Sequence, residues 1–199
     1  MTAINDAFPV SRDAIRREVR ARRRALSPRE QHQAAERIVE RVIGHPRMQA
    51  AKNIAVFLSF DGELNTQPLI ERLWQAGKHV CLPVVHPFSP GHLLFLTYAP
   101  DTPMTTNGFG IREPRLDVRH VLPINALDII LTPLVAFDEQ GQRLGMGGGF
   151  YDRTLQNWQH GGPYPVGLAH DCQRVETLPA QSWDVPLPEI ITPGAHYRW

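Results

Sequence analysis

Apolar positions near the start of the chain recur at helical spacing and predict two helices. Ser11 can cap the first helix, which should end at "LSPRE", where Ser27, Pro28 and Glu30 match the start of a second helix with a capping box. The second helix should end before Gly44. The inward-facing positions are Ile15, Val19 and Ala25 or Leu26 in the first helix, and Ala34, Ala35, Ile38 and Val42 in the second.

Continuous apolar runs follow, and they predict strands covered on both faces, as in a parallel sheet. The runs are "NIAVFLSF" (53–60), "HVCLPVV" (79–85), "HLLFLTYA" (92–99), "LDIILTPLVAF" (127–137), "PVGLAH" (165–170) and "LPEIIT" (187–192). Further helices are predicted over residues 68–78 and 150–158. This alternation predicts an α/β fold: a single open layered domain with a mostly parallel central sheet flanked by helices, preceded by an arginine-rich N-terminal helix. The domain should cover residues 11–199, after a flexible extension over residues 1–10.

The composition is that of an ordinary globular domain, with 42% hydrophobic and 21% charged residues in a chain of 199. No apolar run approaches the roughly 20 residues that span a bilayer, so we expect no membrane segment. The first ten residues lack the basic and apolar regions of a secretory signal. The two cysteines, Cys81 and Cys172, are far apart and outside any metal-binding spacing, so we expect two buried thiols and a cytoplasmic location.

Charge is unevenly distributed along the chain. Residues 12–29 contain eight arginines against Asp13 and Glu18, a local charge of +6, whereas the remaining 13 basic and 18 acidic residues give −5. Three interpretations stay open on charge alone: a solvated helix face, a site for a polyphosphate ligand, or a nucleic-acid contact.

The segment "RLGMGGGFYDR" (143–153) carries the clearest candidate chemistry. It follows a predicted strand and turn and precedes a predicted helix, which is the context in which backbone N–H groups form a phosphate site. The spacing matches neither the Walker nor the Rossmann glycine pattern, so the glycines alone also fit a plain turn. Asp152 falls in the first turn of the helix, where a carboxylate can bind Mg²⁺ or cap the helix.

The longer stretch "PLVAFDEQGQRLGMGGGFYDR" closely resembles the signature of 5-formyltetrahydrofolate cyclo-ligases, also called methenyltetrahydrofolate synthetases. The resemblance extends over nearly the whole chain, through "RDAIRREVRARRRALS", "FLSFDGELNT", "GIREP" and "DVPLPEIIT". It implies an enzyme that uses ATP and Mg²⁺ to convert 5-formyltetrahydrofolate into 5,10-methenyltetrahydrofolate, with release of ADP and phosphate. The γ-phosphoryl group would activate the formyl oxygen, after which N10 of the folate attacks the formyl carbon.

The resemblance also implies roles for individual residues. Glu63 would bind the pterin, with Leu58, Phe60 and Tyr151 beside it, and Arg16 and Tyr151 would be the catalytic residues. Asp152 and Asp184 would bind Mg²⁺. The ATP-binding residues would be Arg12, Arg16, Gly145, Met146, Gly147, Gly148, Gly149, Phe150, Tyr151 and Asp152.

The loop departs from the family pattern at two positions. Relatives often carry a lysine where this chain has Gly148, and a basic residue where it has Met146. Backbone donors, the helix arginines, Arg143 or Arg153 would therefore have to supply more of the positive charge, and a lysine restored at position 148 should be tolerated.

Three residues after a late strand, His170, Asp171 and Gln173, could belong either to the site or to the scaffold. The partners expected are the two small-molecule substrates, with no nucleic acid, no membrane and a monomeric chain. The alternatives are a folate- or nucleotide-binding protein that has lost turnover, and a nucleic-acid-binding protein that uses the arginine-rich helix.

Overall fold

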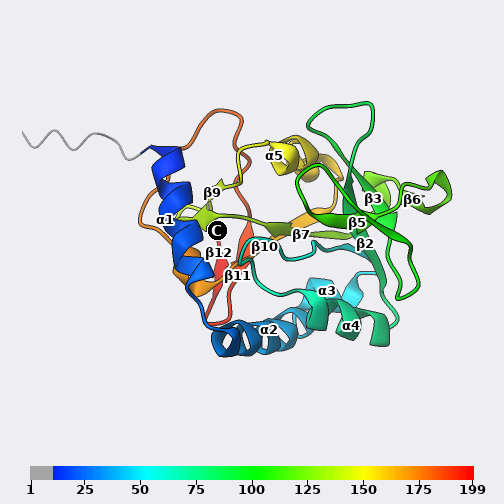
Figure 1. Ribbon diagram of the computed structural model, residues 1–199, viewed down its shortest axis with the longest axis horizontal. Coiled ribbons are helices and arrows are strands. Elements are labelled where there is room, and N and C mark those ends of the chain that lie inside the picture. The colour runs from blue at the N-terminus through cyan, green and yellow to red at the C-terminus, as the bar shows by residue number, and fades with distance from the viewer. Residues whose placement is uncertain (1–10) are drawn as a thin grey trace, which may run out of the picture.

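An eight-stranded sheet runs through the centre of the molecule (Figure 1). The structure is a computed structural model that describes residues 11–199, so the predicted extension over residues 1–10 lies outside the described residues. In sheet order the strands are β12 (His196–Arg198), β11 (Glu189–Ile191), β10 (Tyr164–Leu168), β7 (Ile129–Pro133), β1 (Asn53–Ala55), β2 (His79–Val85), β3 (Leu93–Thr97) and β6 (Val121–Leu122). Neighbours from β11 to β2 are parallel, and β12, β3 and β6 pair antiparallel at the two edges.

Within residues 11–199, two short antiparallel ribbons and five α-helices complete the architecture. The ribbons are β4 (Met104–Thr106) with β5 (Arg112–Pro114), and β8 (Ala136–Phe137) with β9 (Arg143–Leu144). The helices are α1 (Arg12–Arg24), α2 (Pro28–Ile43), α3 (Pro46–Ala50), α4 (Gln67–Gln75) and α5 (Phe150–Leu155). Single 3₁₀ turns lie at Val118–His120, Ile124–Ala126, Trp158–His160 and Asp171–Gln173.

Helices cover both faces of the sheet, and α2, α3 and α4 lie on the face opposite α5 (Figure 1). Strand β7 shows how the alternation of side chains builds two cores. Ile129 and Leu131 pack in the cluster that contains the α2 and α4 residues, whereas Ile130 packs in the cluster with Leu155 of α5. The predicted α/β class and mostly parallel central sheet are therefore confirmed.

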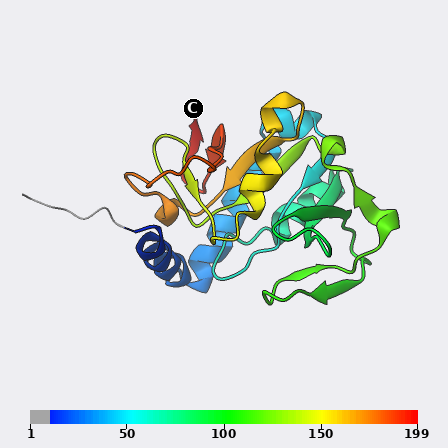
Figure 2. The ribbon, with the colours of Figure 1, turned by 90° about the horizontal axis from the view of Figure 1, so that it is seen from above.

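The first helix, α1, packs against the β8–β9 ribbon at one end of the molecule (Figures 1 and 2). Its buried apolar residues are Ile15 and Val19, and Ser11 caps it as predicted. The helix ends at Arg24, so the predicted alternatives Ala25 and Leu26 lie beyond it, and Arg23 is the buried residue at this end. The α2 capping box is present, because Ser27 and Glu30 bond reciprocally.

Two elements are shorter in the structure than the sequence predicts. The run 53–60 is a strand only over β1; the Val56 N–H still donates to the Cys81 carbonyl oxygen of β2, and beyond it the chain leaves the sheet, with Phe57, Leu58 and Phe60 lining a cavity. Helix α5 ends at Leu155 instead of residue 158. Cys81 is buried as predicted, but Cys172 is only half-buried. Across residues 11–199, none of the helices has the length and apolarity required to cross a bilayer.

Candidate active site

A cavity of about 380 Å³ opens where β1 and β7 end. The parallel strands direct their following loops to this edge, which is where α/β sheets bind ligands. Most of the predicted site residues line it: Leu58, Phe60, Glu63, Gly145, Met146, Gly148, Gly149, Phe150, Tyr151 and Asp152. The predicted residues Arg12, Arg16, Gly147 and Asp184 lie outside this lining, and the first three of them belong to α1 or to the glycine loop.

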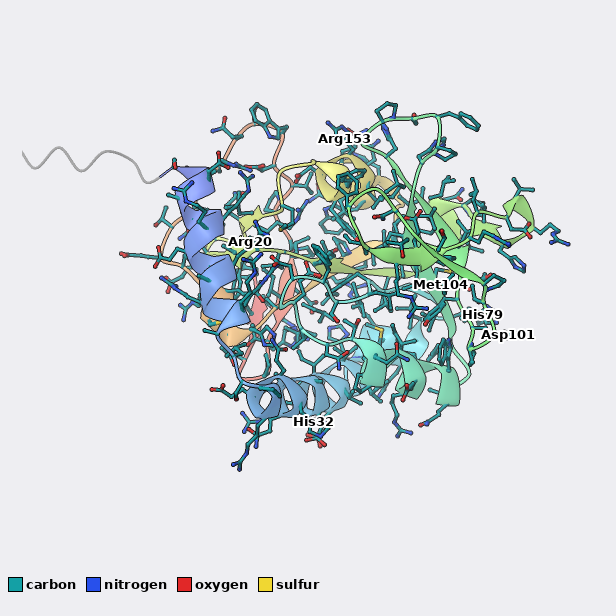
Figure 3. The ribbon with its side chains drawn as sticks, viewed as in Figure 1. Arg20, His32, His79, Asp101, Met104 and Arg153 are labelled. Atoms are coloured by element: carbon teal, nitrogen blue, oxygen red, sulfur yellow. The ribbon has the colours of Figure 1, made fainter. Side chains whose placement is uncertain are left out.

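The glycine loop connects β9 to α5 and uses backbone angles that favour glycine. Gly147 has φ +108° and Gly149, the N-cap of α5, has φ +67°. The Arg153 guanidinium lies against this loop and donates to the carbonyl oxygens of Gly148 (2.8 Å) and Gly91 (3.3 Å) (Figure 3). Arg153 therefore ties the loop to the segment between β2 and β3.

The Phe150 ring occupies the space that a side chain at position 148 would need. A Cβ added at Gly148 would lie 2.7 Å from Cε2 of the Phe150 ring, closer than any real side-chain contact. The expectation that position 148 accepts a lysine stays a prediction, and it requires the Phe150 ring to move first. That ring also packs edge-on against Phe109, with centroids 5.9 Å apart.

Arg16 reaches the glycine loop from α1. Its Nε donates to the Gly145 carbonyl oxygen at 2.9 Å, and its Nη1 pairs with Asp13 at 2.5 Å. The guanidinium lies beside Gly147, since a Cβ there would be 3.6 Å from the Arg16 Cζ. The Arg16 Nε thus holds the loop at Gly145, and the charged guanidinium lies beside Gly147, where no side chain stands in its way.

Two carboxylates and two arginines alternate next to the loop. Arg12 makes a bidentate pair with Asp184 (2.5 and 2.9 Å), and Arg143 Nη2 pairs with Asp152 Oδ1 at 2.6 Å. The Val185 N–H donates to Asp152 Oδ1 at 3.1 Å, so the segment that carries Asp184 contacts Asp152 directly. The Arg12 pairing lowers the pKa of Asp184 against the opposing effect of burial.

Arg143 was expected only as one of several possible sources of charge, and its position makes it a stronger candidate. It is 4% exposed, lines the cavity, and its Nε has no hydrogen-bond partner within the described residues. An unpaired buried donor of this kind is costly unless a ligand satisfies it. The sequence signal was the arginine at the start of the loop; its burial and its pairing with Asp152 depend on the ribbon and on α5.

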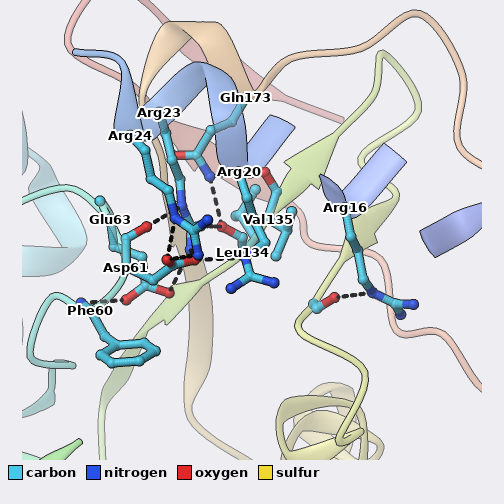
Figure 4. Close-up of polar contacts among 12 residues, drawn as sticks. Arg16, Arg20, Arg23, Arg24, Phe60, Asp61, Glu63, Leu134, Val135 and Gln173 are labelled. Carbon is cyan, nitrogen blue, oxygen red and sulfur yellow. Dashed lines mark hydrogen bonds and ion pairs between the residues drawn. The ribbon is translucent and has the colours of Figure 1, made fainter. Parts of the chain in front are cut away.

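Glu63 lies on the opposite wall, in the turn after β1 (Figure 4). Its side chain is 12% exposed; Oε2 accepts from the Phe60 N–H at 3.1 Å, and Oε1 lies 3.9 Å from Arg23 Nη2. Burial raises the pKa of Glu63 to about 7, against the opposing effect of Arg23. Tyr151 is also in this region, and burial together with the Glu63 charge raises the pKa of its phenol, which stays protonated.

The β4–β5 ribbon supplies a wall that the sequence analysis missed. Asn107, Ile111 and Glu113 line the cavity, and the Asn107 amide donates to Glu113 Oε2 at 3.0 Å. The quoted motif "GIREP" was the available signal, although nothing in its pattern indicates that the ribbon folds over the carboxyl ends of the strands.

The three undecided residues after β10 lie outside the cavity lining, and two of them make internal hydrogen bonds through their side chains. Gln173 donates to the carbonyl oxygens of Leu134 and Val135, and Asp171 accepts from Thr192 and the Gly194 N–H. Burial lowers the pKa of His170 to about 4, and none of the three residues lines the cavity.

A second polar cluster lies at Glu189, the first residue of β11, and thus at the amino end of a strand, whereas the cavity lies at the carboxyl ends. Glu189 Oε2 lies 2.7 Å from His45 Nε2 and 2.8 Å from His196 Nε2, a combination of residues that can bind metals. The His45 Nδ1, however, accepts the Arg47 backbone N–H, so its Nε2 carries the proton and donates to Glu189. The His45–Glu189 contact is therefore a hydrogen bond that needs no ion.

The arginines of α1 are largely engaged within the molecule. Arg12 pairs with Asp184, Arg16 with Asp13 and Arg22 with Glu18, while Arg20, Arg23 and Arg24 all pair with Asp61. Figure 3 shows Arg20 on the side of the helix that faces the rest of the molecule. A nucleic-acid site needs cations that are free to contact phosphates, and this arrangement favours a structural and small-ligand role.

Known proteins are similar to this chain in sequence and in fold. The pattern of the 5-formyltetrahydrofolate cyclo-ligase family matches residues 9–193. The 5-formyltetrahydrofolate cyclo-ligase of Escherichia coli K12 is 60% identical over 91% of this chain and its own full length, and that of Haemophilus influenzae is 56% identical over 90% of this chain and 96% of its own.

Solved structures agree. The 5,10-methenyltetrahydrofolate synthetase of Aquifex aeolicus superposes with a TM-score of 0.81 at 28% identity, covering 94% of this chain and 92% of that one. The Mycoplasma pneumoniae synthetase gives a TM-score of 0.72 at 26% identity, covering 92% of this chain and 99% of that one. By sequence match, fold and the residues around the cavity, the chain belongs to the 5-formyltetrahydrofolate cyclo-ligase family.

Proposed function

We propose that this protein converts 5-formyltetrahydrofolate and ATP into 5,10-methenyltetrahydrofolate, ADP and phosphate. The observation that carries the proposal is one cavity with a buried carboxylate, Glu63, on one wall and a glycine loop with arginines on the other. A substrate that fills it can place its pterin at Glu63 and its formyl group toward phosphates bound at the loop.

The reaction needs activation of a poor leaving group. The formyl oxygen attacks the γ-phosphorus of ATP and ADP departs; N10 of the folate then attacks the formyl carbon, N10 loses its proton, and the oxygen leaves as part of phosphate. The protein must align the two substrates, stabilise the charge that develops on the transferring phosphoryl group and exclude water. No protein nucleophile is required.

On the ATP side, the loop residues 145–149 offer backbone N–H groups, and Arg12, Arg16 and Arg143 supply positive charge. Arg16 is the proposed catalytic cation because it lies beside Gly147 while its Nε fixes Gly145. Arg143 has an Nε that can donate into the cavity. These arginines replace the loop lysine that position 148 lacks.

On the folate side, Glu63 accepts the amino and ring N–H groups of the pterin, a bidentate match between a carboxylate and two donors. Leu58 and Phe60 provide apolar surface, and the protonated Tyr151 phenol can donate to the formyl group or to a phosphate oxygen. The apolar walls keep water from the activated carbon.

Mg²⁺ fits the donor set next to the loop. Asp152 and Asp184 provide carboxylate oxygens on adjoining segments, the ligand type that Mg²⁺ prefers. When bound with the nucleotide, Mg²⁺ would neutralise charge on the phosphates. Arg12 and Arg143, which pair with these carboxylates, would then be free to turn toward the nucleotide.

The direct test is the growth of methenyl-folate absorbance when purified protein is mixed with 5-formyltetrahydrofolate, ATP and Mg²⁺. The proposal requires growth that depends on ATP and is absent with a non-hydrolysable analogue. Tight binding of both substrates with no product would instead support the alternative of a binding protein without turnover, for which the missing lysine at Gly148 is the motivating observation. We propose further that the protein acts as a cytoplasmic monomer, away from membranes and nucleic acid.

A further inference from the structure

We propose that Arg23 is the positioning residue of the folate subsite: from inside the protein it fixes the turn 61–63 against α1 and presents Glu63 to the cavity with a positive charge behind it. This inference rests on the proposed role of Glu63 in folate recognition. Arg23 itself does not line the cavity and acts through Glu63.

Arg23 is an arginine that the protein has buried completely. Its side chain is 0% exposed, although it belongs to the most basic segment of the sequence. Its donors bond the turn and the segment between β7 and β8: Nε donates to the Asp61 carbonyl oxygen (2.8 Å), Nη2 to Asp61 Oδ2 (3.1 Å) and Nη1 to the Leu134 carbonyl oxygen (3.4 Å) (Figure 4). Burying a guanidinium this deeply costs stability unless it is paired and hydrogen-bonded, and Arg23 obtains both from the turn.

The turn that Arg23 binds is strained in a way that fixes its shape. Asp61 has φ +55°, which among the described residues makes it the one non-glycine position in the left-handed region. Its carboxylate also pairs with Arg20 (2.6 Å) and Arg24. The following Gly62, at φ +76°, lies so close to the α1 backbone that a Cβ there would be 3.3 Å from the Arg23 carbonyl carbon. Glu63 therefore enters the cavity from a turn that α1 holds in one conformation.

The cluster of Asp61 and the three arginines that pair with it carries a net positive charge. Arg20, Arg23 and Arg24 contribute three positive charges and Asp61 one negative charge, so the cluster carries a surplus beside Glu63. Of the three arginines, Arg23 is the one that approaches Glu63, at 3.9 Å. A carboxylate that is nearly buried needs such a charge to remain ionised, and only the ionised form accepts two N–H groups from a pterin.

Tyr151, His170 and Asp61 also face Glu63, but none of them supplies a positive charge near pH 7. Arg23 is therefore the cation that stabilises the ionised form of Glu63. Tyr151 on α5 is kept protonated by burial, which raises its pKa. The His170 ring faces the backbone of residues 62 and 63, and burial, assisted by Arg23, lowers its pKa to about 4, so it is neutral near pH 7. Asp61, in the same turn, raises the pKa of Glu63 and works against ionisation.

The test is the dissociation constant of 5-formyltetrahydrofolate, measured by calorimetry from pH 6 to 9 without nucleotide. In the unmodified protein, affinity should fall about tenfold per pH unit below about pH 7, where the pKa of Glu63 lies. Arg23→Gln, which keeps polar contacts with Asp61 but removes the charge, should move this midpoint upward by about 1–3 pH units. Arg23→Lys should restore most of the original midpoint.

Two matched variants separate charge from packing. Arg24→Gln removes a contact with the same Asp61 carboxylate from a half-exposed position and should leave the midpoint where it is. Asp61→Asn should move the midpoint downward, because it removes a negative charge while asparagine tolerates the left-handed backbone. This opposite shift tests the inference even if Arg23→Gln fails to fold.

Glu63→Gln distinguishes failure of the inference from failure of the proposed function. If it weakens folate binding and abolishes the pH dependence, Glu63 recognises the pterin; unaltered affinity would remove Glu63 from the site. If Glu63→Gln behaves as expected but Arg23→Gln or Asp61→Asn leaves the midpoint unmoved, the proposed function stands and the positioning role of Arg23 is overturned. Midpoints that shift in opposite directions for the two variants support it.

Discussion

Replacing Gly147 by alanine isolates the contribution of backbone shape to the glycine loop, because the change removes no chemical group. Gly147 has φ +108°, an angle that costs an alanine about 1–3 kcal/mol. The added methyl itself meets only ordinary contacts, with the Arg16 Cζ at 3.6 Å. The cost must therefore appear either as lost stability of the loop or as a loop that relaxes away from Arg16.

Gly145→Ala is the matched control, two residues earlier in the same loop. Gly145 does not have a left-handed φ, and a Cβ there would lie 3.8 Å from the Arg143 Nη1, an ordinary contact. The assays are thermal unfolding and the KM for ATP. In a chain of this size 1 kcal/mol lowers Tm by about 2–4 °C, and 1.4 kcal/mol lost in binding raises KM about tenfold.

Gly147→Ala should therefore lower Tm by several degrees, raise the KM for ATP, or do both to a smaller extent. The free-energy cost summed over the two assays should be larger for Gly147→Ala than for Gly145→Ala. Equal effects of the two substitutions would refute the reasoning, because they would show that the loop does not depend on the backbone angle of Gly147.

Three further substitutions test individual contacts. Arg16→Ala should raise the KM for ATP about tenfold or more, on the scale of a hydrogen bond to a charged group, whereas alanine at the exposed neighbour Arg17 should not; equal kinetics of the two variants would remove Arg16 from the ATP site. Glu63→Gln should weaken folate binding by about 1–3 kcal/mol in calorimetry at pH 8, and an unchanged constant would contradict the pterin assignment. Gly148→Lys should destabilise the protein by about 1–3 kcal/mol in denaturant unfolding, and pairing it with Phe150→Ala should recover much of that loss; additive costs would show that the two residues do not conflict.

Helix starts were predictable because caps are local. Ser27 and Glu30 need only the backbone of their own turn, so the sequence "SPRE" fixes the start of α2 without reference to the rest of the fold. Residues that line the cavity, including Glu63 and Tyr151, were identified through the resemblance to the family, whose motifs are local stretches of sequence, and not through the apolar pattern.

Features that depend on long-range contacts were not predictable. The charge of the N-terminal segment indicated a solvated or ligand-binding helix, yet Arg23 is buried because Asp61, 38 positions later, folds onto it. The apolar run 53–60 predicted a long strand, but Phe57 and Leu58 leave the sheet to line the cavity. The β4–β5 ribbon escaped prediction because each of its strands has three residues and packs against the site rather than along the main sheet.

The central claim is that the formyl oxygen receives the γ-phosphoryl group, and the fate of that oxygen tests it most directly. 5-Formyltetrahydrofolate labelled with ¹⁸O in the formyl group should be converted with ATP in unlabelled water, and the released phosphate analysed by mass spectrometry. The proposed reaction transfers the formyl oxygen to phosphate, so each phosphate should carry one ¹⁸O atom. Methenyl-folate formed together with unlabelled phosphate would contradict phosphoryl activation of the formyl oxygen in this site.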